Sequence, residues 1–120
     1  MLFTVLDALK ELRSPFALYE TDIHAMVGKR LADAGLAYRH EARIGPGCRI
    51  DYLVNGVGIE IKKGKPDART LTRQLMRYAA CEDIQSLIVL SQRTVALPQS
   101  VCGKPVKVLV LNQLWGVALP

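Results

Sequence analysis

The spacing of apolar residues changes along this chain, and the change predicts an α/β arrangement. Over residues 2–12 and 16–34 the apolar positions recur every three or four residues, which is the period of an amphipathic helix. From residue 38 onward they alternate or form short runs bounded by glycine and proline, a pattern typical of strands. The helical period returns over residues 68–80. The predicted strands are residues 38–44, 49–54, 57–62, 84–91 and 106–111.

Turn residues mark where these elements begin and end. Ser14 followed by Pro15 is a favoured start for the second helix, and Thr21 offers a later cap for a shorter helix. Asn55-Gly56 is the strongest short hairpin signal in the chain. The strands on either side of it are therefore expected to pair, and the later helix is expected to cross to a further strand of a mixed sheet.

The composition supports one folded domain over residues 1–120. Half of the residues are hydrophobic and 22% are charged, which supplies a core and excludes a disordered chain. Lys and Arg number 16 against 11 Asp and Glu, and the net charge of +5 favours an acidic partner such as nucleic acid. The N-terminal segment carries acids where a signal peptide is basic or apolar, and no apolar run is long enough to span a membrane. We therefore expect a cytoplasmic α/β domain with no membrane partner.

The cysteines and histidines predict no special chemistry. Cys48, Cys81 and Cys102 lie far apart, and their odd number argues against a disulfide framework. A Cys/His zinc site would need nearly every cysteine and histidine in the chain, so none is expected. Cys48 is expected to be a small buried residue rather than a nucleophile. His24 and His40 are expected on the surface, although His24 follows Glu20 by one helical turn.

The informative chemistry lies in the two strands that flank the Asn55-Gly56 turn. Side chains alternate along a strand, so Glu60 and Lys62 face one side while the isoleucines between them face the other. Hairpin register places Asp51 within a few residues of Glu60. Two carboxylates repel each other unless a cation lies between them, and oxygen donors of this kind suit Mg²⁺ or Mn²⁺. The alternative is an ordinary solvent-facing strand with a Glu–Lys pair.

An Asp, a hairpin, a Glu-x-Lys and then a helix form a pattern that resembles the PD-(D/E)XK nuclease superfamily. Asp51 matches the first Asp of that motif, and Glu60 with Lys62 matches its last part. Ile50 stands where the motif's name has proline, a frequent departure in the superfamily. The resemblance covers about residues 16–91 and implies a single restriction-endonuclease-like domain, with a mixed central sheet flanked by helices.

The resemblance also implies roles for residues of the two strands. Asp51 and Glu60 would hold Mg²⁺ or Mn²⁺, together with the backbone carbonyl of Ile61. Lys62 would position the attacking water or neutralise developing charge on a phosphate.

Helical residues would complete such a site. Members of the superfamily add an acid from the helix before the sheet, and Glu20 is the first choice for it, acting on the metal directly or through water. Asp22 and Glu41 are its competitors. Gln74 and Tyr78, four residues apart on the later helix, match a Gln-x-x-x-Tyr that many members place behind the site.

The positive charge gathers just after the Glu-x-Lys strand. Three arginines recur every four residues and predict a stripe along one helix face, which a phosphate backbone would neutralise. The alternative is a solvated helix face. The residues expected to bind nucleic acid are Lys63, Lys65, Arg69, Arg73, Arg77 and Arg49.

Together these features predict a small Mg²⁺-dependent DNA nuclease that hydrolyses phosphodiester bonds. The resemblance extends to nucleases of phages and mobile elements and to dimeric Holliday-junction resolvases, so a recombination or repair endonuclease is one alternative. A second alternative is a DNA-binding or assembly module that kept the fold without the chemistry. A third is an unrelated α/β interaction protein, in which Asp51 and Glu60 point away from each other. The apolar residues 114–119 suggest a homodimer interface.

Overall fold

A mixed six-stranded sheet forms the centre of the protein in a computed structural model that describes residues 1–12 and 19–114. Its strands are β1 (Arg39–Gly45), β2 (Cys48–Val54), β3 (Val57–Lys62), β4 (Ser86–Ser91), β5 (Ser100–Val101) and β6 (Lys104–Val110). Their order across the sheet is β1-β2-β3-β4-β6-β5. The first three strands are antiparallel neighbours, whereas β3, β4 and β6 run parallel. The predicted class, an α/β domain with a mixed sheet flanked by helices, is confirmed.

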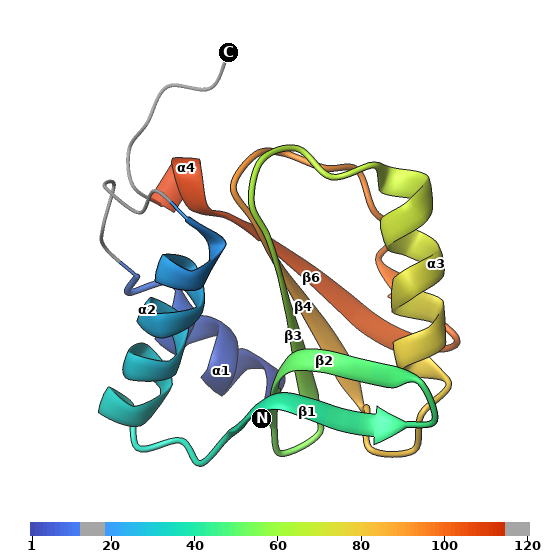
Figure 1. Cartoon of the computed structure of the whole chain (residues 1–120), viewed down its shortest axis with the longest axis horizontal. Coiled ribbons are helices and arrows are strands. Elements are labelled where there is room, and N and C mark those ends of the chain that lie inside the picture. The colour runs from blue at the N-terminus through green and yellow to red at the C-terminus, as the bar shows by residue number, and fades with distance from the viewer. Residues whose placement is uncertain (13–18, 115–120) are drawn as a thin grey trace.

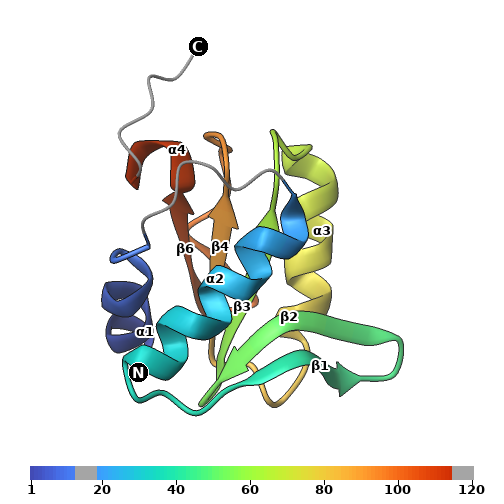
Figure 2. The ribbon, with the colours of Figure 1, turned by 60° about the vertical axis from the view of Figure 1, so that its left-hand side comes forward.

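Helices cover both faces of this sheet (Figure 1, Figure 2). They are α1 (Leu2–Leu9), α2 (Glu20–Asp33), α3 (Ala68–Ala79) and the single turn α4 (Leu111–Leu114). The apolar stripes of α1 and α2 pack with Ile59 and Ile61 of β3 in one cluster. On the opposite face, Leu71 and Leu75 of α3 pack against alternate residues of the same sheet. The central strands are therefore buried on both sides, as expected for parallel strands between two helical layers.

The structure differs from the sequence prediction at several element ends. Helix α2 begins at Glu20 rather than near residue 16, because the Asp22 carboxylate accepts the Tyr19 N–H at 2.8 Å and caps the helix there. Ser14 and Pro15 lie outside the described residues, as do residues 115–119 of the predicted dimer segment. The two-residue strand β5 was missed, since so short a run carries no alternating pattern. No helix among the described residues has the length and apolar character needed to cross a membrane.

The β1–β2 hairpin changes faces halfway along its length. Ile50 packs in the α3 cluster, whereas Tyr52, two positions later, packs in the α2 cluster. Side chains two apart on a regular strand share a face, so β2 turns over at Asp51. Across the hairpin, Glu41 lies opposite Asp51 and has a left-handed φ of +54°. Figure 1 shows the far end of this hairpin reaching toward the C-terminal end of α3.

Gly58 on β3 leaves the space that this change of face requires. A Cβ at position 58 would collide with the Cδ1 of Ile50 and crowd Ile84 and Leu87. The absence of a side chain at position 58 therefore leaves room for the Ile50 side chain to lie against β3.

Candidate functional site

Asp51 and Glu60, here called the carboxylate pair, meet where the β2–β3 ladder ends. The last paired residues are Tyr52 and Ile59, which places Asp51 across from Glu60 and confirms the predicted register. Beyond that pair, β2 and β3 are no longer joined by backbone pairing. A side-chain hydrogen bond joins them instead, in which the Ile61 N–H donates to Asp51 Oδ2 at 2.7 Å. This bond fixes the Asp51 carboxylate against β3.

Glu60 is a buried acid whose charge is only partly balanced. Only 4% of the residue is exposed, and its Oε1 has no hydrogen-bond partner. Lys62 Nζ lies 3.3 Å from the other oxygen, Oε2. Burial, followed by the negative charge of Asp51, raises the pKa of Glu60 to about 7, although Lys62 opposes the shift. A buried acceptor without a donor destabilises a fold, so Glu60 Oε1 is suited to take up a proton or a cation.

The donors around the carboxylate pair fit a hard divalent ion. Glu60 offers Oε1, and the bond from Ile61 to Asp51 Oδ2 leaves Asp51 Oδ1 for a ligand. The N–H and C=O of one residue in a strand point toward the same neighbour, so the Ile61 carbonyl also faces the Asp51 side. An all-oxygen set with two carboxylates is the donor chemistry that Mg²⁺ and Mn²⁺ prefer. The three predicted ligands therefore share one location, although their roles stay predictions.

Gln74 and Tyr78 lie behind the carboxylate pair on the α3 side. Gln74 Nε2 donates to the Tyr78 hydroxyl at 2.8 Å, and that hydroxyl donates to the Arg49 carbonyl at 3.1 Å. Burial and the negative charge of Glu60 raise the pKa of Tyr78 far above its usual value, so its hydroxyl stays protonated. Gln74 also shares with Lys62 the lining of a cavity of about 170 Å³. Gln74 thus reaches the site through Tyr78.

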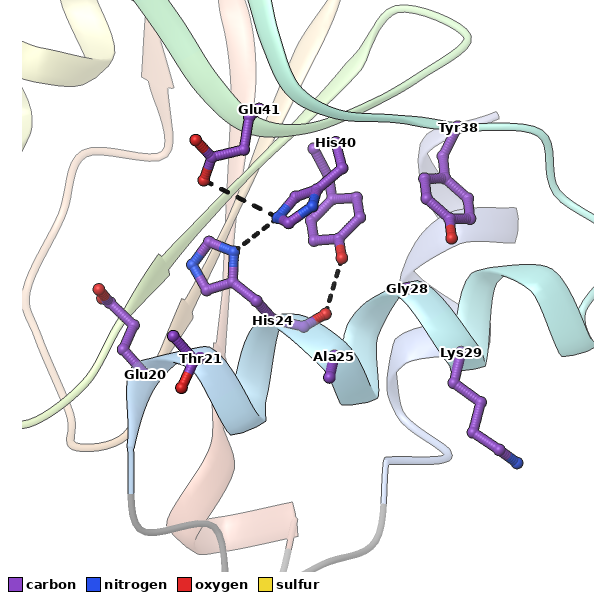
Figure 3. A pocket seen from close by; sticks show the side chains of 10 residues that line it. Glu20, Thr21, His24, Ala25, Gly28, Lys29, Tyr38, His40 and Glu41 are labelled. Carbon is purple, nitrogen blue, oxygen red and sulfur yellow. Dashed lines mark hydrogen bonds and ion pairs between the residues drawn. The ribbon is translucent and has the colours of Figure 1, made fainter.

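His24 lies beside Asp51 and is half-buried, which matches the alternative position near the site rather than the favoured one on the helix surface. Its side chain is only 13% exposed, and its Nε2 lies 3.8 Å from Asp51 Oδ2. The imidazole projects from α2 into a cavity of about 430 Å³ that Glu20 also lines (Figure 3). The Glu20 side chain makes no hydrogen bond or ion pair with residues 1–12 and 19–114. The acid chosen for the site thus lines the neighbouring cavity rather than contacting the carboxylate pair.

The two competitors for that acidic role have other partners. Asp22 caps α2 through the Tyr19 N–H. Glu41 lies on β1 within ion-pair distance of His40, at 3.9 Å, and of Arg49, at 3.6 Å. Arg49 thus has Glu41 as a partner on an exposed surface, and its role in nucleic-acid binding stays a prediction.

The outer face of α3 carries the expected row of positive charge. Arg69, Arg73 and Arg77 are exposed, whereas the residues between them on the inner face are buried. Lys63 and Lys65 are exposed in the preceding loop, where Lys63 Nζ lies 5.7 Å from the centre of the Tyr19 ring. No ion pair involves Lys65 or the three arginines in the described part of the chain. This row stays available to a polyanion, and its binding role remains a prediction.

The sequence analysis did not predict that His40 of the β1–β2 hairpin lies against His24 of α2. His40 lies directly across from Tyr52, and His24 Nδ1 is 2.9 Å from His40 Nε2. Pairing residues outward from the Gly45–Cys48 turn would have placed His40 opposite Leu53, whereas an irregularity between Arg43 and Gly45 shifts the observed register and puts His40 opposite Tyr52. Neither this shift nor the change of face at Asp51 has a signal in the sequence.

No family model, curated protein or solved structure matches the chain. Its residues therefore have to be assigned roles from their geometry and chemistry.

Proposed function

We propose that this protein is a Mg²⁺-dependent DNA nuclease that hydrolyses phosphodiester bonds. The observation that carries the proposal is the carboxylate pair with its buried, unpartnered Glu60 Oε1 beside Lys62. The pKa of Glu60 is raised, and strongly shifted pKa values are concentrated at functional sites. The similarity of the motif to the PD-(D/E)XK superfamily supports the same reading, with Asp51, Glu60 and Lys62 in the motif positions.

Each group of the site has a defined task in this proposal. A bound Mg²⁺ supplies Lewis-acid stabilisation of the phosphate in the transition state. Asp51 and Glu60 hold the ion, and Lys62 orients the attacking water and offsets negative charge that develops on the phosphate oxygens. Tyr78, held by Gln74, maintains the wall behind Glu60. The exposed arginines of α3 hold the phosphates on either side of the scissile bond.

A cleavage assay with purified protein tests the proposal. The panel consists of linear duplex, single-stranded, nicked, flapped and four-way DNA, each with Mg²⁺, with Mn²⁺ and with chelator. We expect metal-dependent cutting of at least one substrate. Asp51→Asn and Glu60→Gln should each lower the rate about 10³-fold or more, because the loss of several kcal/mol of metal stabilisation has that effect.

Asp83→Asn and Glu82→Gln are the matched controls, since both residues are exposed and remote from the carboxylate pair. Equal activity in the site variants and the controls would show that the wrong site has been chosen. DNA binding without cutting, under every metal condition, would support an inactive binding module instead. Preference for the four-way substrate would support a junction-resolving endonuclease. Cytoplasmic location and homodimer formation stay predictions.

A further inference from the structure

A second group of ligating side chains lies next to the carboxylate pair, on the side of α2. We call His24, His40 and Glu41 the histidine cluster. Each offers one donor atom, and the three atoms lie within 4.8 Å of one another. Figure 3 shows the two imidazole rings and the Glu41 carboxylate turned toward each other at one end of the α2 cavity. Three donors of this kind converging from a helix and a strand match the protein ligands of a four-coordinate zinc site that keeps one position for water.

The spacing of the donors is close to what a metal ion needs. A tetrahedral ion with bonds of about 2.0–2.1 Å holds its ligand atoms roughly 3.3 Å apart. His24 Nδ1 and His40 Nε2 are 2.9 Å apart, and His40 Nε2 is 3.9 Å from Glu41 Oε1. Both separations differ from the ideal value by less than about 1 Å. The third separation, between His24 and Glu41, is at most 4.8 Å, so side-chain rotations that close it by up to about 1.5 Å would bring all three donors onto one ion.

The surrounding structure holds these ligands in place. The His40 ring stacks on Tyr52, with ring centres 4.4 Å apart and an interplanar angle of 15°. The Tyr52 hydroxyl donates to the His24 carbonyl at 2.7 Å, and Gly28 leaves room for that hydroxyl against α2. Glu41 adopts its left-handed φ at the position of the cluster, a conformation that persists only where the surroundings enforce it.

Asp51 lies where a metal-bound histidine commonly has its outer partner. If His24 ligates through Nδ1, its Nε2–H faces Asp51 Oδ2 at 3.8 Å, which is longer than a hydrogen bond. A side-chain rotation that closes this distance on metal binding would let the carboxylate fix the tautomer and the orientation of the ring. Asp51 therefore belongs to the carboxylate pair and also lies beside the histidine cluster.

We propose that the histidine cluster is a binding site for a transition-metal ion of the Zn²⁺ type, distinct from the Mg²⁺ site of the carboxylate pair. His24 and His40 bind through nitrogen and Glu41 through oxygen, a set that suits zinc better than magnesium. The fourth position opens toward the cavity of about 430 Å³ and is filled by water. Asp51 is a positioning residue for His24 in this site.

Zn²⁺ titration of the metal-free full chain tests the proposal without DNA. Calorimetry gives the affinity, and Co²⁺ gives the visible absorption of a tetrahedral nitrogen–oxygen site without a thiolate charge-transfer band. We expect one tight site. His40→Ala and Glu41→Gln should each weaken Zn²⁺ binding about 100-fold or more, and Asp51→Asn about 10-fold, in line with the cost of an outer-partner change.

Two variants distinguish Zn²⁺ binding at the histidine cluster from metal binding at the carboxylate pair, on which the proposed nuclease activity depends. Glu82→Gln is the matched surface control, and Glu60→Gln removes a ligand of the carboxylate pair alone. Both should keep wild-type Zn²⁺ affinity. Unchanged Zn²⁺ affinity in His40→Ala and Glu41→Gln, or a thiolate band in the Co²⁺ spectrum, would overturn the inference. A protein that binds Zn²⁺ through the histidine cluster yet cuts no DNA would disprove the nuclease and leave this site intact.

Discussion

The carboxylate pair and the histidine cluster are separated by a single cross-strand position, yet they differ in almost every physical respect. The carboxylate pair offers only oxygen, and its Glu60 is buried with an unpartnered atom. The histidine cluster offers two nitrogens and one oxygen, and its His40 and Glu41 are exposed. The difference shows how neighbouring residues can favour different ions through donor type and burial rather than through distance.

After the loss of a metal ligand, the next largest effect is expected from Lys62, which contacts Glu60 of the carboxylate pair. Lys62→Gln removes the positive charge beside Glu60 Oε2. We expect a loss of about 10²–10³ in the single-turnover cleavage rate, as for other groups that stabilise transition-state charge. DNA affinity should change little, since the exposed arginines remain. A Lys62→Gln enzyme that cuts at the wild-type rate would contradict the role of Lys62.

Glu60→Gln should show how much the buried charge of Glu60 destabilises the folded protein. The folded protein keeps a proton on Glu60 up to about pH 7, whereas the unfolded chain releases it near the usual value of 4.5. The stability of the metal-free protein therefore falls as the pH rises between these values. The variant should unfold with a free energy up to about 3 kcal/mol higher than wild type at pH 8, and with little difference at pH 4.

Denaturant melts at both pH values, in the presence of chelator, measure this difference. Glu82→Gln provides the exposed control and should stay within about 0.5 kcal/mol of wild type. A Glu60→Gln protein that is less stable than wild type at pH 8 would show that the carboxylate is not under strain.

The smallest expected effect is the pH dependence of Mn²⁺ binding at the carboxylate pair. A proton on Glu60 competes with the ion, so affinity should fall as the pH drops through the raised pKa. Between pH 8 and pH 6 we expect about a 10-fold loss by calorimetry. His40→Ala protein is used for this titration, so that the histidine cluster does not add to the signal. A flat affinity profile would exclude Glu60 as a ligand.

Much of the fold follows from the sequence because its signals are local. The Asn55-Gly56 turn fixes the register of β2 and β3, and that register brings Asp51 to Glu60. The alternating isoleucines of β3 and the apolar stripe of α3 specify the two layers.

The histidine cluster could not be predicted in this way. Its geometry depends on where α2 begins and on the change of face at Asp51, and both arise from tertiary contacts. The cap formed by Asp22 sets the start of the helix, and Gly58 leaves room for the Ile50 side chain on the α3 side of the sheet. A periodic pattern of apolar residues carries neither piece of information.

The opposition of Glu41 and Asp51 across the hairpin has a mechanical consequence. The separation of the two sites is set by the spacing between paired strands, about 5 Å, rather than by any loop or domain boundary. Thermal motion of α2 or α3 can loosen an individual ligand, but it leaves this backbone spacing unchanged. Only a slip of the hairpin register would alter it, and such a slip would also exchange the buried and exposed faces of β1. The geometry that joins the two sites is therefore protected by the same packing that stabilises the fold.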